Sequence, residues 1–97
     1  MAPIAISVVI PVYNEINTIG QVIERVLKCG CEVEVLVVDD ASTDGTREFL
    51  KRCADPNVHC FFHAVNRGKG AALRLGFAAA KKPLVIVQDA DLEYDPC

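Results

Sequence analysis

Two aspartates near the end of the chain, Asp89 and Asp91, carry the clearest chemical signal. On an extended segment, residues i and i+2 point to the same side and lie about 6–7 Å apart along the backbone, so both carboxylates can reach one ion. Carboxylate oxygens suit a hard divalent cation such as Mg²⁺ or Mn²⁺, which keeps positions open for water and phosphate oxygens. The alternative is a solvated acidic turn, because short motifs match by chance. The position directly after Leu84–Gln88, expected to be a buried strand, favours the metal site.

Polar clusters follow two other apolar runs. Tyr13-Asn14-Glu15 follow Ile6–Val12, and Asp39-Asp40-Ala41-Ser42 close Val33–Asp39. A carboxylate at such a strand end can accept hydrogen bonds from a nucleobase edge or a ribose hydroxyl. It can equally cap the following helix. Both roles are compatible if Asp40 faces a ligand while Asp39 or Ser42 serves the backbone.

A further cluster, Asn66-Arg67-Gly68-Lys69-Gly70, places two cations and two glycines at the start of a predicted helix. The unpaired N–H groups and the dipole of a helix N-terminus favour an anion there. The sequence has neither the G-x-x-x-x-G-K-[ST] phosphate loop nor the G-x-G-x-x-G dinucleotide pattern.

Histidines and cysteines offer weaker candidates. His59 and His63 stand four residues apart with Phe61 between them, and a metal pair is conceivable. We favour packing at the sheet edge or in the core, because no suitably spaced carboxylate or cysteine completes a ligand set. Cys29-x-Cys31 is favoured as structural for a similar reason, since it has no second cysteine pair.

Apolar periodicity predicts the elements that position these side chains. Short β-branched runs predict strands, and apolar residues spaced three and four apart predict helices. The first predicted helix can be capped by Asn17 and stopped by Gly30. The second can be capped by Thr43 or Ser42. Phe61, Phe62 and Phe77 are expected in the core, and Glu32, Glu34, Lys81 and Lys82 on solvated faces. The strands are expected at Ile6–Val12, Val33–Asp39, Val58–Phe62 and Leu84–Gln88, and the helices at Ile19–Leu27, around Phe49, Leu50 and Cys53, and at Gly70–Ala80.

Strands that alternate with single helices run parallel through right-handed crossovers. The β-α-β-α-β-α-β order therefore predicts an α/β fold: an open, doubly wound, mostly parallel sheet in three α/β/α layers, or the first half of one. All four polar clusters then lie at the carboxyl ends of the strands, where such sheets bind ligands.

Length and composition limit the remaining classes. Ninety-seven residues with 52% hydrophobic and 24% charged residues predict a single folded domain over residues 1–97. A net charge of −3 argues against nucleic acid as a partner. No apolar run approaches the roughly 20 residues that cross a bilayer, and no secretory signal is visible. Five cysteines, an odd number without zinc-ribbon spacing, fit a reducing cytoplasm.

The four clusters together resemble the family 2 glycosyltransferases, and among them the dolichyl- and polyprenyl-phosphate sugar synthases. The resemblance runs in the right order over nearly the whole chain, through Val8–Glu15, Val37–Thr46, Asn66–Ala72 and Gln88–Tyr94. It implies a GT-A fold, whose nucleotide-sugar-binding half precedes an acceptor-binding half, and transfer of the sugar with inversion.

The resemblance also assigns roles. It implies a nucleotide-sugar donor such as a UDP- or GDP-sugar, a Mg²⁺ or Mn²⁺ cofactor and, in the synthase branch, a polyprenyl-phosphate acceptor. The implied nucleotide-binding residues are Pro11, Tyr13, Asn14, Glu15, Asp40, Arg67, Lys69 and Asp89, of which Asp40 contacts the base, and the implied metal ligands are Asp89 and Asp91.

The family continues beyond the point where this sequence ends. We therefore expect donor and metal binding within 1–97, with any general base and the acceptor site beyond Cys97. The parent enzyme would be cytoplasmic or lie at the cytoplasmic face of a membrane. We also expect the open edge of Leu84–Gln88 to promote self-association.

Two other classes stay open. A non-catalytic nucleotide-sugar-binding or assembly module would share every feature above. A receiver-like signalling domain would also carry acidic residues on a parallel sheet, but its acidic pair should follow the first strand, where this sequence has Tyr13-Asn14-Glu15.

Overall fold

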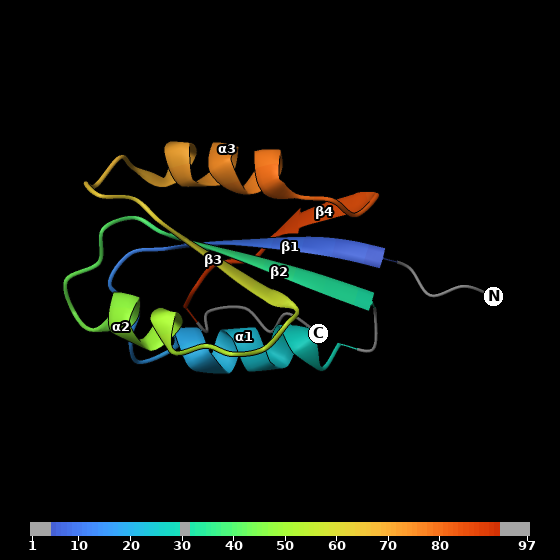
Figure 1. Cartoon of the computed structure of the whole chain (residues 1–97), viewed down its shortest axis with the longest axis horizontal. Coiled ribbons are helices and arrows are strands. Elements are labelled where there is room, and N and C mark those ends of the chain that lie inside the picture. The colour runs from blue at the N-terminus through green and yellow to red at the C-terminus, as the bar shows by residue number, and fades with distance from the viewer. Residues whose placement is uncertain (1–4, 30–31, 92–97) are drawn as a thin grey trace.

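The chain forms one parallel sheet between two layers of helices. The computed structural model describes residues 5–29 and 32–91. The sheet order is β3-β2-β1-β4; α3 covers one face, and α1 and α2 cover the other (Figure 1). This confirms the predicted three-layer α/β fold. The elements are β1 (Ala5–Val12), α1 (Ile19–Leu27), β2 (Glu32–Asp39), α2 (Thr46–Lys51), β3 (Val58–Phe62), α3 (Lys69–Ala79) and β4 (Leu84–Val87).

Strand β1 lies inside the sheet and is apolar on both faces. Its alternate side chains Val8, Ile10 and Val12 are buried in the core beneath α1 and α2, while Val9 lies against α3. Parallel strands covered on both faces require such continuous apolar runs. The predicted stripe of α1 is confirmed by the burial of four of its residues, namely Ile19, Val22, Ile23 and Val26.

Helix α3 approaches the sheet through small residues. Ala72 and Gly76 are its buried positions, and a Cβ on Gly76 would collide with Val9 Cγ1. Phe77 stands one position beyond this contact and is 49% exposed, so its expected place in the core is wrong. A large side chain could not fit where α3 packs this closely.

Helix α1 spans Ile19–Leu27 as predicted, but the residues that precede α1 and α2 differ from the predicted caps. Helix α1 starts after Thr18 rather than being capped by Asn17, and α2 starts after Gly45 rather than after Thr43 or Ser42. In each case the expected cap lies in a loop between a strand and a helix. Gly30 and Cys31 lie outside the described residues, so the predicted stop of α1 and the Cys29-x-Cys31 interpretation stay predictions.

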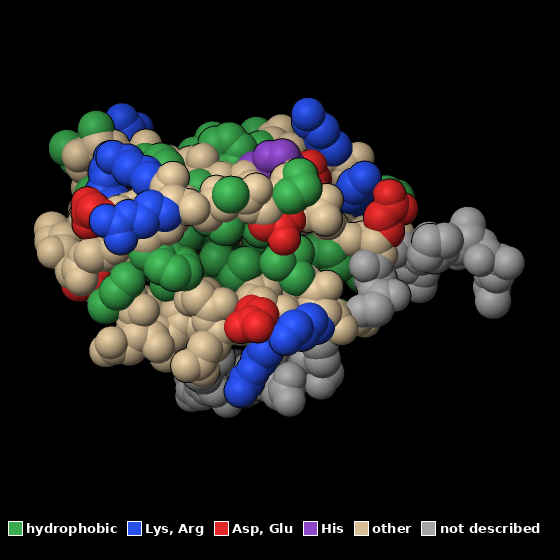
Figure 2. Space-filling model, turned by 60° about the horizontal axis from the view of Figure 1, so that its bottom comes forward, with side chains coloured by type: hydrophobic (Ala, Val, Ile, Leu, Met, Phe, Trp, Pro, Cys, Tyr) green, Lys and Arg blue, Asp and Glu red, His purple; other side chains and the backbone are tan. Residues whose placement is uncertain are grey.

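The core near β3 is only partly covered. Seen from the side of α1 and α2, hydrophobic side chains form an exposed band across the middle of the molecule (Figure 2). Cys53, Cys60 and Phe62 are half-buried against the core, with the Arg47 guanidinium 5.3 Å from the centre of the Phe62 ring. Burial raises the pKa of the Cys60 thiol to about 11, which keeps it neutral and unreactive at physiological pH.

Strand β4 forms the opposite edge and is not buried. The four side chains of Leu84–Val87 are 41–49% exposed, which corrects the expectation of a buried strand there. The strand pairs with β1 along one side, and α3 packs on β1 and β2 instead. Within residues 5–29 and 32–91, no helix has the length and hydropathy needed to cross a membrane.

Glu34 is buried, contrary to the solvated position expected for it. Glu34 is 8% exposed, and its Oε2 accepts hydrogen bonds from Ser7 Oγ at 2.7 Å and from the Lys81 backbone N–H at 3.1 Å. Ser7 Oγ in turn accepts from the Lys82 N–H. Burial alone would raise the pKa of Glu34, but these hydrogen bonds to the ionised form hold the pKa below its usual value. The Ser7 and Glu34 side chains therefore bind the connection between α3 and β4 to β1 and β2, the two inner strands of the sheet.

We predict that Glu34→Gln lowers the free energy of unfolding by about 1 kcal/mol at pH 7, because a neutral acceptor replaces a charged one. Because folding lowers the pKa of Glu34, its stabilisation is complete above about pH 4.3 and is lost as the pH falls through the folded value. The difference between wild type and variant in urea unfolding should therefore shrink between pH 7 and about pH 3.

Glu24→Gln is the matched control, because Glu24 pairs with Lys28 on the exposed surface of α1. Its effect should stay below about 0.5 kcal/mol. An equal loss of stability in both variants would contradict the role given to Glu34.

Candidate functional site

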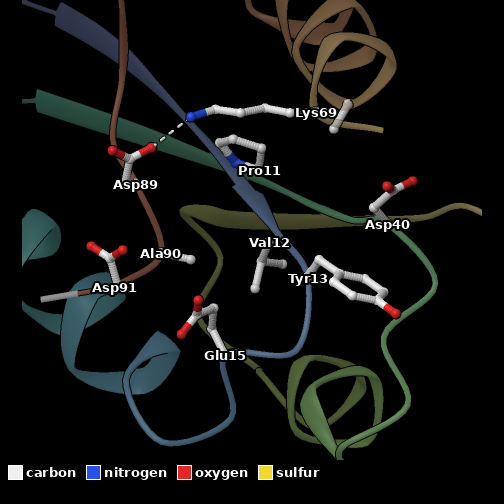
Figure 3. A pocket seen from close by; sticks show the side chains of 10 residues that line it. Pro11, Val12, Tyr13, Glu15, Asp40, Lys69, Asp89, Ala90 and Asp91 are labelled. Atoms are coloured by element: carbon white, nitrogen blue, oxygen red, sulfur yellow. Dashed lines mark hydrogen bonds and ion pairs between the residues drawn. The ribbon is translucent and has the colours of Figure 1, made fainter. Parts of the chain in front are cut away.

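A pocket of about 260 Å³ opens at the carboxyl ends of β1, β2 and β4. Chain order reverses at β1, whose neighbours are β2 on one side and β4 on the other. Open α/β sheets bind ligands at such a switch point. The pocket is lined by Pro11, Val12, Tyr13, Glu15, Asp40, Lys69, Ala72, Asp89, Ala90 and Asp91 (Figure 3).

This pocket brings together all the predicted site residues except Asn14 and Arg67. Asn14 instead adopts a left-handed conformation, with φ of 53°, and its Oδ1 accepts the Thr43 N–H at 2.7 Å. The Arg67 backbone N–H donates to Asp40, and the residue is exposed. The structure therefore gives both residues a place in the loops around the pocket rather than in its lining.

One end of the pocket is acidic. The Asp89 and Asp91 carboxylates lie on the same side of it, and the Lys69 side chain reaches across to Asp89, with Nζ 3.0 Å from Oδ1 (Figure 3). The residues described by the structure contain no group of three or more His, Cys, Asp and Glu side chains that could hold a metal ion. Two carboxylates nevertheless fit Mg²⁺, which typically takes one or two protein carboxylates and completes its shell with phosphate oxygens and water.

The other end carries an aromatic ring and a buried carboxylate. Tyr13 is 48% exposed, and its ring lies on the same side of the pocket as Asp40 (Figure 3). An exposed aromatic ring offers a stacking surface for a planar ligand. The pocket thus combines a surface suited to a base with a separate surface suited to a metal and phosphates.

Asp40 organises the loop before α3. Its Oδ1 accepts from the Arg67 N–H and its Oδ2 from the Gly68 N–H, each at 2.8 Å, and His63 Nδ1 lies 2.8 Å from Oδ1. Burial would raise the pKa of Asp40, but these partners hold it below its usual value. The partners of Asp40 therefore lie before α3, and Asp40 does not cap α2. Asp39 is the aspartate that bonds the backbone after β2, because its Oδ2 accepts from the Ser42 N–H.

The sequence interpretation assigned His63 to packing and missed its contact with the pocket residue Asp40. His63 follows the end of β3, its side chain is 12% exposed, and its backbone N–H donates to the Asp39 carbonyl at 2.9 Å. His59, by contrast, is exposed. Only the pairing of β2 with β3 brings His63 to Asp40, so spacing along the chain gave no signal for this contact.

Side chains also tie the β1–α1 loop to the β2–α2 loop. The Asn14 N–H donates to Ser42 Oγ at 2.9 Å, and the Ile16 N–H donates to Asp44 Oδ2 at 3.1 Å. Asp44 Oδ1 accepts from both the N–H and the hydroxyl of Thr46. These bonds hold Tyr13 and Glu15 against the pocket and explain why α2 begins only at Thr46.

A single hydroxyl connects the start of α1 to the acidic end. Thr18 Oγ1 donates to the Ala90 carbonyl at 2.8 Å, across 72 positions of the chain. Ala90 stands between the two aspartates and is 5% exposed. The bond fixes the backbone from which Asp89 and Asp91 project.

Residues 7–97 match the family described as glycosyl transferase family 2. The chain belongs to this family. The structural match agrees, because the fold superposes on solved glycosyltransferases with TM-scores up to 0.82.

Similar family members include two sequences named undecaprenyl-phosphate 4-deoxy-4-formamido-L-arabinose transferase. The one from Pectobacterium atrosepticum is 42% identical, and the one from Proteus mirabilis is 39% identical. Each match covers 94% of this chain and 30% of the relative. The chain thus spans about a third of the length of these transferases.

Among solved structures, a mannosyltransferase from Pyrobaculum calidifontis in complex with GDP-Man and Mn²⁺ gives a TM-score of 0.82 at 32% identity, over 94% of this chain and 28% of that one. S. aureus TarS 1–349 in complex with UDP-GlcNAc gives 0.81 at 28% identity, over 91% of this chain and 27% of that one. A glucosyl-3-phosphoglycerate synthase from Mycobacterium tuberculosis, solved with Mn²⁺ and UDP, gives 0.71 at 31% identity, over 90% and 33%.

We predict that Asp40→Ala destabilises this family member by about 1–3 kcal/mol, because the Arg67 and Gly68 N–H groups lose a charged acceptor. Amide hydrogen exchange at Arg67 and Gly68 should accelerate more than exchange in α1. Asp55→Ala is the control, since the Asp55 side chain accepts a hydrogen bond from the Asn57 N–H in an exposed turn. Unchanged exchange at both amides in Asp40→Ala would show that Asp40 does not hold the loop.

Proposed function

We propose that residues 1–97 form the donor-binding part of a glycosyltransferase that transfers a sugar, with inversion, from a UDP- or GDP-sugar to an acceptor. One observation carries the proposal: a single pocket at the switch point of the sheet joins an aromatic end to an acidic end. A nucleotide sugar has the matching chemistry, with a planar base at one end and a charged diphosphate toward the other. Complexes of the similar mannosyltransferase and TarS with nucleotide sugars support this reading.

Under this proposal the base lies on Tyr13 near Asp40, and Pro11 and Glu15 flank the middle of the nucleotide. Asp40 reads the base with the lone pair on Oδ2 that its three protein partners leave available. Asn14 and Arg67 contribute through the loops that they order. The diphosphate lies toward Lys69, at the N-terminus of α3, where helix N–H groups favour an anion.

Asp89 and Asp91 would hold the divalent cation, Mg²⁺ or Mn²⁺. When bound, the ion neutralises charge that builds on the leaving diphosphate. The Mn²⁺ in two of the similar structures supports this assignment. The chain's own contribution is a pair of carboxylates on one backbone turn, which the Thr18 hydroxyl fixes through Ala90.

The acceptor we propose is a polyprenyl phosphate, on the strength of the relatives named undecaprenyl-phosphate transferases. A phosphate oxygen is already ionised at neutral pH and needs no general base. Such an acceptor would place the protein at the cytoplasmic face of a membrane. Transfer of labelled sugar to a polyprenyl phosphate by a protein that carries both this donor-binding part and an acceptor site would distinguish an enzyme from a non-catalytic nucleotide-sugar-binding module.

We predict that UDP or GDP binds only with a divalent cation, because Asp89 and Asp91 otherwise oppose the diphosphate with like charge. Calorimetry with Mn²⁺ and with EDTA measures this difference. Asp91→Asn should weaken the metal-dependent binding by about 1–3 kcal/mol.

Lys82→Ala is the control, because Lys82 pairs with Glu32 outside the pocket and should leave binding unchanged. Affinity for both nucleotides that is the same in EDTA as in Mn²⁺ would refute the metal assignment.

The exposed edge of β4 leads to a separate prediction, namely that the chain self-associates. Among the residues that the structure describes, strand β4 is paired on one side only and carries four half-exposed apolar residues, and such edges template pairing with another chain. The mass measured by light scattering should rise above 10.5 kDa with concentration. Val85→Lys with Val87→Lys should suppress the rise, whereas Val65→Lys, at a 60% exposed position away from the edge, should not. A wild-type monomer at every concentration would contradict the prediction.

A further inference from the structure

Lys69 and Asp89 form an ion pair across the pocket. The ammonium nitrogen lies 3.0 Å from Asp89 Oδ1, and the side chains are 63% and 41% exposed. Figure 3 shows Lys69 extended past Pro11 toward the acidic end. Lys69 is the first residue of α3, whereas Asp89 follows β4, so the pair joins the start of α3 to the segment after β4.

This pair places a cation on one of the two carboxylates that the proposed function assigns to the metal. A carboxylate oxygen that already faces an ammonium group attracts a second cation less strongly, and the two like charges repel each other. An exposed ion pair of this kind contributes little stability, so a ligand with more favourable contacts can displace it.

We propose that Lys69 competes with the divalent cation for Asp89 and exchanges this carboxylate for the donor diphosphate. The inference rests on the proposed function. The lysine stem is flexible enough to turn from Asp89 to a phosphate within the same pocket. Its ammonium group then lies beside an anion that the N-terminus of α3 also favours.

The exchange makes metal and donor binding mutually dependent. The cation alone must displace Lys69, whereas the cation together with a diphosphate gives Lys69 a new partner. Each ligand therefore raises the affinity for the other, as linkage requires. Lys69 accordingly lowers the affinity for the cation alone and raises the affinity for the cation and the diphosphate together.

Lys69→Met tests the exchange through two effects of opposite sign. The affinity for Mn²⁺ alone, measured from the free-ion signal in electron paramagnetic resonance, should rise about two- to fivefold. The affinity for UDP or GDP at saturating Mn²⁺, measured by calorimetry, should fall about tenfold or more. Lys69→Arg keeps the charge and should stay closer to wild type in both titrations.

Lys28→Met is the matched control, because Lys28 forms a 3.0 Å pair with Glu24 on the exposed face of α1. It should alter neither titration, and thermal melting of each variant verifies folding. Mn²⁺ affinity that is unchanged or lower in Lys69→Met, or unchanged nucleotide affinity, would overturn the exchange. If wild type itself binds no nucleotide with Mn²⁺, both the proposed function and the exchange fail. If wild type binds both ligands and Lys69→Met matches it, only the exchange fails.

Discussion

Strand β1 pairs with β2 on one side and β4 on the other, all in parallel, and the positions of the functional side chains depend on this pairing. Because chain order reverses at β1, the loop after β1 and the segment after β4 leave the sheet at the same edge, where the Thr18 hydroxyl joins them through the Ala90 carbonyl. The apolar run of β1 permits this position, since its neighbours cover both of its edges and helices cover both of its faces. A polar β1 could not occupy the middle of such a sheet.

Polar side chains then hold the loops in place. Asp40 bonds the segment before α3, Asp44 bonds the segment before α1, and Thr18 bonds the backbone between the two aspartates. Ala41 has a φ of 64°, a strained conformation for a residue with a Cβ, directly after Asp40. Asp40 lines the pocket, whereas Asp44 and Thr18 do not, so residues outside the lining also determine the geometry of the pocket before any ligand arrives.

The sequence predicted the strands, the helices and most of the pocket, because those features depend on periodicity and on which edge of the sheet a strand end reaches. The prediction was wrong where the hydrogen-bonding partner of a side chain comes from a distant segment of the chain. Glu34 has the pattern of a solvated strand residue, and only the pairing with β1 reveals the Ser7 hydroxyl beside it. His63 likewise reaches Asp40 through the pairing of β2 with β3. The exposure of Phe77 follows from the close approach of Gly76 to the sheet, which helical periodicity does not predict.

The proposed metal and nucleotide site lies at the switch point of the sheet. Amide resonances of the ¹⁵N-labelled chain, recorded with UDP or GDP and a small amount of Mn²⁺, locate the bound ion, because the paramagnetic ion broadens only nearby signals. We expect broadening at Glu15, Lys69 and Asp89–Asp91, with sharp signals at Glu34 and Lys81 at the opposite end of the strands. Uniform broadening, or broadening centred away from Asp89–Asp91, would show that the metal does not bind at this site.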